Sequence, residues 1–163
     1  MVRKNTAIND NLFKNLIDME TNLSGLYLML STKCKGTMSA AFKKISIDSM
    51  NHGVTLRLIK DELAKNISFS IPNSELLQIT KRSKDISDQA RKVIDELKVA
   101  NKVDGRTLVQ LNKLEQCEDD ALEIYIKFHK SYILSNNTEK IVSQLIEGII
   151  NDEKEHSKLL QII

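Results

Sequence analysis

Apolar residues recur along this chain at alternating steps of three and four, the spacing that places them on one face of an α-helix. The stripe from Phe13 to Leu30 and the one from Met38 to Leu63 are the longest near the N-terminus. Three further stripes of the same kind follow. Together they predict five helices, over about residues 9–32, 38–66, 74–102, 107–134 and 138–162.

Breaks between the stripes fall where the local sequence disfavours a helix. Residues 33–37 contain Gly36 and predict a short turn. Pro72 cannot continue a helix, and Asn73 or Ser74 after it could cap a new one. The stripe over 74–102 fits either one helix or two helices with a break at residues 83–85.

The connections between the predicted helices indicate an antiparallel bundle. A short turn makes the helices over 9–32 and 38–66 antiparallel neighbours, and residues 135–137 do the same for the last two. The segment 74–102 would be about 40 Å long as a helix, enough to cross a bundle from end to end. We therefore expect an all-α protein, with residues 1–163 forming one four-helix-bundle domain and a long helical crossover between its second and third helices.

Composition supports this fold class and limits the functions. The chain has 163 residues, 41% of them hydrophobic, with one Pro, five Gly and no Trp, which suits long helices. Twenty-four Lys and Arg are scattered among 22 Asp and Glu without interleaved aromatic residues, so no nucleic-acid surface is expected. Two separate Cys and no long apolar run predict a cytoplasmic protein that does not span a membrane.

Ionisable residues interrupt the stripes where buried aliphatic residues would be expected. Glu20 and Glu118 interrupt the first and fourth stripes, and His52 interrupts the second. In the last stripe, Glu153 and His156 stand one helical turn apart. A buried carboxylate needs a partner, and Glu-x-x-His on an inward face is a metal-ligand spacing. The alternative is a hydrogen-bonded Glu-His pair in a bundle without metal.

The interruptions form an internal repeat. Glu20 precedes Tyr27 by seven residues, and Glu118 precedes Tyr125 by the same distance. Asp48, Ser49 and His52 likewise match Asp152, Glu153 and His156 in spacing. Two antiparallel helix pairs related by a pseudo-two-fold axis would bring the interrupting residues to one level of the bundle.

This pattern resembles the ferritin-like di-iron carboxylate superfamily, and within it the rubrerythrin-like proteins. The resemblance spans nearly the whole chain and implies a four-helix bundle that binds two ions. It implies Glu20 and Glu118 as terminal carboxylates, His52 and His156 as imidazole ligands and Glu153 as a bridging carboxylate. It also implies that Asp48 and Asp152 orient the histidines and that Tyr27 and Tyr125 lie near the metals.

Ser49 departs from the family, because it stands where a second bridging Glu would be. A hydroxyl is a poor ligand for a divalent ion, so retention of the metal is expected to be weaker. Two ions could still share Glu153, or one ion could be held by Glu118, Glu153 and His156. The resemblance implies iron, whereas the carboxylate and imidazole ligands would also suit manganese or zinc.

Two functions follow from these alternatives. The first is a peroxidase-like or ferroxidase-like oxidoreductase that reacts ferrous iron with peroxide or oxygen, using an external electron donor because rubredoxin-type Cys ligands are absent. The second is a ferritin-like scaffold that has lost metal chemistry and acts as a structural or partner-binding bundle. In both cases we expect a homodimer, because the stripe over 74–102 could cover either the bundle or a second copy.

Overall fold

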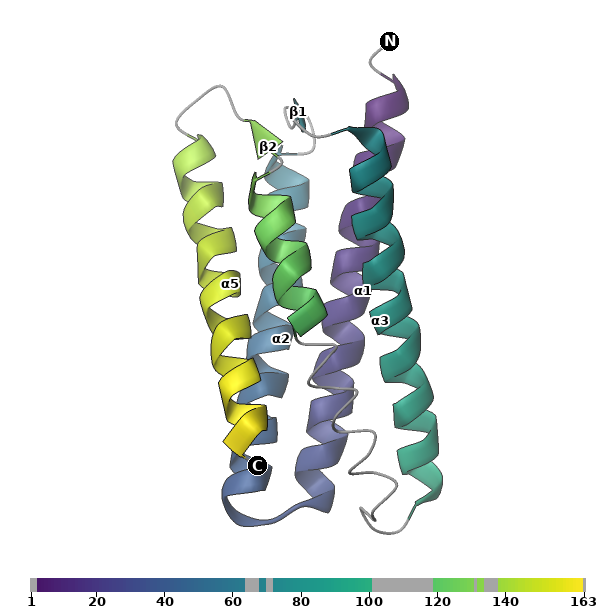
Figure 1. The fold of residues 1–163 in the computed structure, drawn as a ribbon, viewed down its shortest axis with the longest axis vertical. Coiled ribbons are helices and arrows are strands. Elements are labelled where there is room, and N and C mark those ends of the chain that lie inside the picture. The colour runs from purple at the N-terminus through teal and green to yellow at the C-terminus, as the bar shows by residue number, and fades with distance from the viewer. Residues whose placement is uncertain are drawn as a thin grey trace.

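The computed structural model describes residues 3–63, 68–69, 72–100, 119–130, 132–133 and 138–162, with side chains at 8–61, 72–100, 119–130 and 140–161. The described residues are helical apart from short connections and two strands of two residues each. The all-α prediction is therefore confirmed. Figure 1 shows long helices that lie side by side along the longest axis of the molecule.

Helices α1 (Arg3–Lys33) and α2 (Gly36–Leu63) form an antiparallel pair joined by a two-residue connection. Gly36 takes a φ of +64°, a left-handed conformation that glycine adopts without steric cost, and this lets α2 start directly after the turn. Both helices are close to the predicted ranges. Helix α1 starts at Arg3 rather than near residue 9, and α2 starts two residues before the predicted position.

Helix α3 (Asn73–Val99) is one continuous helix, so there is no break at residues 83–85. Its N-cap is Pro72, whose carbonyl accepts the N–H groups of Glu75 at 2.9 Å and Leu76 at 3.3 Å. No side chain caps the helix, so the prediction of an Asn73 or Ser74 cap was wrong. The backbone carbonyl of Pro72 satisfies these N–H groups instead.

The fourth predicted helix, over 107–134, differs most from the structure. Residues 119–130 are helical, but Tyr132–Ile133 form strand β2, so the helix does not reach residue 134. Strand β2 pairs antiparallel with β1 (Ser68–Phe69), with Phe69 opposite Tyr132. The start of the predicted helix, including Glu118, lies outside the described residues. Helix α5 (Thr138–Ile162) has the predicted bounds.

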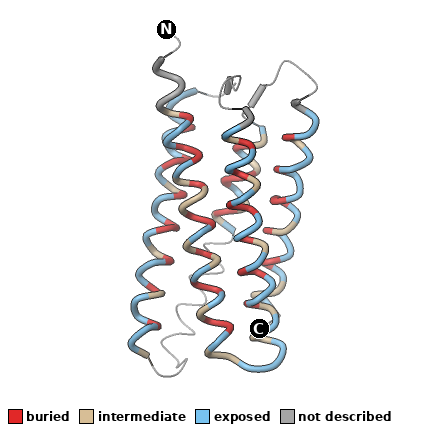
Figure 2. The backbone as a smooth tube through the Cα atoms, turned by 180° about the vertical axis from the view of Figure 1, so that it is seen from behind, coloured by how far each residue is buried: buried red, intermediate tan, exposed pale blue. Residues whose placement is uncertain are grey.

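The apolar stripes form a shared core. Figure 2 shows buried positions repeating along one side of each helix. Helix α1 packs against α2 and α3, and α2 packs against α5. Segment 119–130 reaches α1 through Phe13 and Phe128, whose rings meet edge to face at 5.6 Å. It reaches α5 through a 2.9 Å hydrogen bond between His129 and Ser143.

Helix α3 places its stripe against the rest of the protein. Leu76, Ile79, Ile86 and Leu97 are buried, and α3 packs along α1. On its flank, Arg82 binds Asp120 and Glu123 of segment 119–130. The stripe of α3 is therefore covered within the chain, so it is not available to a second copy.

Candidate metal centre

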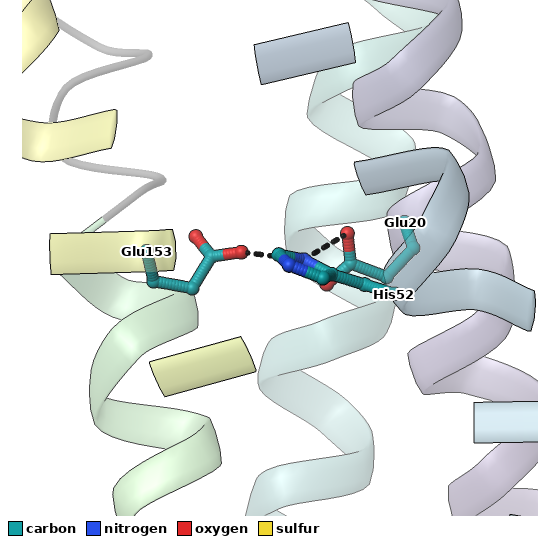
Figure 3. A group of neighbouring side chains, drawn as sticks. All are labelled: Glu20, His52 and Glu153. Atoms are coloured by element: carbon teal, nitrogen blue, oxygen red, sulfur yellow. Dashed lines mark ion pairs between the residues drawn. The ribbon is translucent and has the colours of Figure 1, made fainter. Parts of the chain in front are cut away.

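Three buried side chains from three helices converge at the middle of the bundle. Glu20 from α1 and Glu153 from α5 are fully buried, and His52 from α2 is 3% exposed. Each offers one ligand atom, and these atoms all lie within 4.8 Å of one another. Figure 3 shows the imidazole of His52 between the two carboxylates.

The histidine directs one ring nitrogen into this cluster. Nδ1 of His52 lies 3.0 Å from Oε1 of Glu153 and 3.5 Å from Oε2 of Glu20. Neither approach has the geometry of a hydrogen bond to Nδ1. The nitrogen and the two carboxylates thus point toward a common volume.

Two aspartates bind the outer nitrogens of the two histidines in a crossed arrangement. His52 on α2 donates through Nε2 to Oδ2 of Asp152 on α5, at 3.1 Å. His156 on α5 donates through Nε2 to Oδ2 of Asp48 on α2, also at 3.1 Å. An ionised carboxylate only accepts hydrogen bonds, so each aspartate fixes the proton of its histidine on Nε2. In neutral imidazoles, the Nδ1 lone pairs would then face the core.

Glu153 lies between the two imidazoles. Its Oε1 is 3.0 Å from Nδ1 of His52, and its Oε2 is 3.6 Å from Nδ1 of His156. The two rings are roughly parallel, with centroids 5.9 Å apart. Each carboxylate oxygen of Glu153 therefore faces a different histidine.

Tyr125 connects segment 119–130 to the cluster. Its hydroxyl donates a hydrogen bond to Oε1 of Glu20, and both side chains are fully buried. The bond fixes one oxygen of Glu20, and Oε2 remains directed at His52. Tyr27, the matching residue in the repeat, is also fully buried and stacks on Phe42 with ring centroids 5.9 Å apart.

Several buried polar atoms at this level lack a hydrogen bond from any described residue. They include Oε2 of Glu20, Nδ1 of His52 and Oγ of Ser49. A buried polar group without a partner costs about 1–3 kcal/mol, and more if it is charged. Two of these atoms belong to the converging cluster. The core is thus built with ligand atoms that a cation would satisfy.

The electrostatics of the cluster favour a positive charge. Burial lowers the pKa of the His52 imidazole, but the Glu20 and Glu153 carboxylates more than offset this effect and raise the pKa to about 11. A divalent ion with neutral His52 would balance both carboxylates.

Asp48, which binds His156, is held in its ionised form by its neighbours. Burial raises the pKa of Asp48, but hydrogen bonds from Lys44 and His156 outweigh it and hold the pKa below its usual value. Lys44 lies 2.7 Å from Asp48 and 3.5 Å from the exposed Glu155. Sequence reasoning did not identify Lys44, although its position four residues before Asp48 is the spacing of a helical ion pair.

The structure brings together most of the residues that the sequence singled out. Glu20, His52, Glu153 and His156 are buried at one level, and Asp48, Asp152 and Tyr125 contact them. Ser49 is also buried. Glu118 lies outside the described residues, so its predicted role as a ligand remains a prediction. Glu20, His52 and Glu153 form a group that could hold a metal ion.

Among the described residues, no helix is long and apolar enough to cross a membrane. Comparisons of the chain with models of protein families, with curated proteins and with solved structures found no match.

Proposed function

We propose that this protein is a non-haem iron protein of the rubrerythrin-like, ferritin-like type, which reduces peroxide or oxygen with ferrous iron. The observation that carries the proposal is the convergence of Glu20, His52 and Glu153 within 4.8 Å at the buried centre of a helical bundle. Carboxylates and imidazoles are the ligands that iron takes in such bundles. The packing of the described helices is compatible with the ferritin-like topology.

In this proposal, the ligands divide between two halves of the site. Glu20 and His52 would hold one ion, and His156, with Glu118, would hold the other. Glu153 would be shared, which is supported by its placement between the two histidines at 3.0 and 3.6 Å. With Ser49 in place of a second bridging carboxylate, a single ion is the alternative.

The remaining residues would prepare the site. Asp152 and Asp48 hold the Nε2 protons of the histidines, which leaves Nδ1 of each ring for the ion. Tyr125 fixes Glu20 through one oxygen. The complete burial of both glutamates keeps water away from the ligands. When bound, the iron would supply the Lewis acid and the redox centre.

The choice of iron and of peroxide rests on the family resemblance, because the same ligands suit manganese and zinc. Rubredoxin-type Cys ligands are absent from the sequence, which contains two Cys. Electrons would therefore come from a separate donor.

The test is an anaerobic titration of chelator-treated protein with ferrous iron, followed by thermal unfolding. We expect one or two ions per chain and a higher melting temperature with metal, because a ligand that binds only the native state stabilises it. Glu153→Gln should abolish most of the binding. Glu147→Gln is the matched control, since Glu147 is 56% exposed on the same helix. Absence of binding, or equal binding by Glu153→Gln, would refute the proposal.

Ser49 favours a second candidate, a bundle without metal chemistry. Ser49 is buried, but a neutral hydroxyl is a poor ligand for a divalent ion, so it contributes little to such a site. In that case the native protein would bind no iron, and Ser49→Glu would introduce binding. Ser49→Gln, which has the same size without the charge, is the control. Tight binding by the native protein would exclude this candidate.

A further inference from the structure

Helix α2 carries a second apolar stripe on the side opposite its buried one. Ile47, Met50, Val54 and Leu58 are 54%, 56%, 48% and 57% exposed. Their steps of three and four place them on one face of the helix. The buried stripe, which includes Ile45, His52 and Ile59, occupies the opposite face. We call the four exposed residues the outer stripe.

The outer stripe is unusual for a helix at the surface of a bundle. A surface helix normally has one apolar face and one polar face, and a helix that is apolar on both sides is usually covered on both. Helix α3 shows the normal arrangement, with Lys84, Asp88, Arg91 and Lys92 exposed on the side away from its buried stripe. Among the described residues, α2 alone presents four half-exposed, large apolar side chains in register.

The outer stripe is nearly symmetric about the level of His52, with two apolar residues on each side. When two copies of α2 lie antiparallel and cross at the level of His52, Met50 of one copy meets Val54 of the other, and Ile47 meets Leu58. A two-fold axis generates this arrangement, because each contact then occurs twice. The four apolar residues of one copy, which have similar exposure, therefore face the same four residues of the other.

Charges at the ends of the stripe are also complementary. Lys43 precedes the stripe and Asp61 follows it, about five helical turns later, so both lie on the same face of the helix. Both are exposed. In the antiparallel arrangement, Lys43 of one copy lies opposite Asp61 of the other, at both ends of the contact. A parallel arrangement would instead place like charges together.

From this apolar and charge complementarity, we propose that the outer stripe of α2 is the interface between two copies of the chain, related by a two-fold axis level with His52. The sequence led us to expect a dimer through the stripe over 74–102, but that stripe is buried against α1. Specific interfaces bury about 800 Å² on each partner, more than one helical stripe provides. Leu28 of α1, 54% exposed on the neighbouring helix, is expected to add to the contact.

The proposal predicts a dimer that depends on the outer stripe. Sedimentation velocity should show a dimer for the wild type at micromolar concentration and a monomer for Met50→Lys combined with Val54→Lys. Leu77→Lys is the matched control, because Leu77 is 53% exposed on α3, and it should remain dimeric. Circular dichroism checks that each variant is folded. A monomeric wild type, or a folded Met50→Lys/Val54→Lys variant that remains dimeric, overturns the proposal.

A charge exchange tests the antiparallel register and separates a second copy from a different partner. Lys43→Glu alone should weaken dimerisation by about tenfold, because two acidic residues then face each other at each end. Asp61→Lys alone should have a similar effect. The double variant Lys43→Glu/Asp61→Lys should restore the dimer. If the double variant is weaker than both single variants, the proposed register is wrong.

Discussion

Asp152 on α5 accepts a hydrogen bond from Nε2 of His52 on α2, at 3.1 Å, although the two residues are 100 positions apart in the chain. This bond turns Nδ1 of the histidine toward Glu153 and Glu20. Asp152 is 43% exposed, so it links a buried ring to the surface of the bundle. The bond therefore holds a residue of the cluster from outside the cluster.

Asp152→Asn should weaken metal binding without unfolding the protein. The amide could still accept a hydrogen bond, but it loses the charge that holds the proton on Nε2, and such changes typically reduce metal affinity about 10–100-fold. Ferrous titration of Asp152→Asn and of the control Glu147→Gln measures the difference. Equal affinities in the two variants would show that the contact does not orient the ligand.

Tyr125→Phe should destabilise the metal-free protein by about 1–3 kcal/mol, because Glu20 loses the hydrogen bond that satisfies one of its buried oxygens. Urea unfolding in the presence of chelator measures the free energy of unfolding. In a Glu20→Gln background the same substitution should lower the free energy of unfolding by less, because the charged acceptor of the Tyr125 hydroxyl is gone. Equal costs in both backgrounds would show that the charge of Glu20 does not strengthen this hydrogen bond.

The stability of the metal-free protein should fall as pH rises through the alkaline range. The pKa of His52 is raised from 6.5 to about 11, so between these values the folded state binds a proton that the unfolded state releases. The stabilisation is fully present below pH 6.5 and is lost as pH rises through the folded pKa, at a slope of at most about 1.4 kcal/mol per pH unit. Urea unfolding between pH 7 and 10 measures the slope.

His52→Gln is the control for this measurement, because Lys and Tyr residues titrate in the same range in both proteins. The variant should show the smaller slope. Equal slopes in the two proteins would mean that the histidine is neutral in the folded protein, because the unfolded histidine is already neutral above pH 6.5.

Gly53→Ala should leave the stability unchanged or raise it by up to about 1 kcal/mol. Gly53 is inside α2, where glycine is less favourable than alanine, and an added Cβ would lie 3.6 Å from Cβ of Glu20, an ordinary contact. Gly148→Ala in α5 is the control, because nothing lies within 4 Å of an added Cβ there. Loss of stability in Gly53→Ala alone would indicate that α1 and α2 pack too closely for a methyl group.

The sequence by itself determined which side chains are buried. The face of a helix follows from local spacing, so the stripes predicted the inward positions of Glu20, His52, Glu153 and His156 before any contact was known. The repeat also predicted that these residues lie at one level. The bounds of α5 and the near coincidence of α1, α2 and α3 with the predicted ranges have the same local origin.

Only the tertiary structure decided how these residues meet. The spacing of residues in the sequence does not show that Asp152 binds His52 and Asp48 binds His156, because each pair joins two helices that are distant in the chain. The fourth helix gives way to strand β2 because Tyr132–Ile133 pair with Ser68–Phe69, a contact between distant segments that helical periodicity does not record. From the sequence, the stripe of α3 could have covered either the same chain or a second copy. In the structure it packs along α1 of the same chain. Local sequence sets the face that a helix buries, and the arrangement of the helices sets what that face contacts.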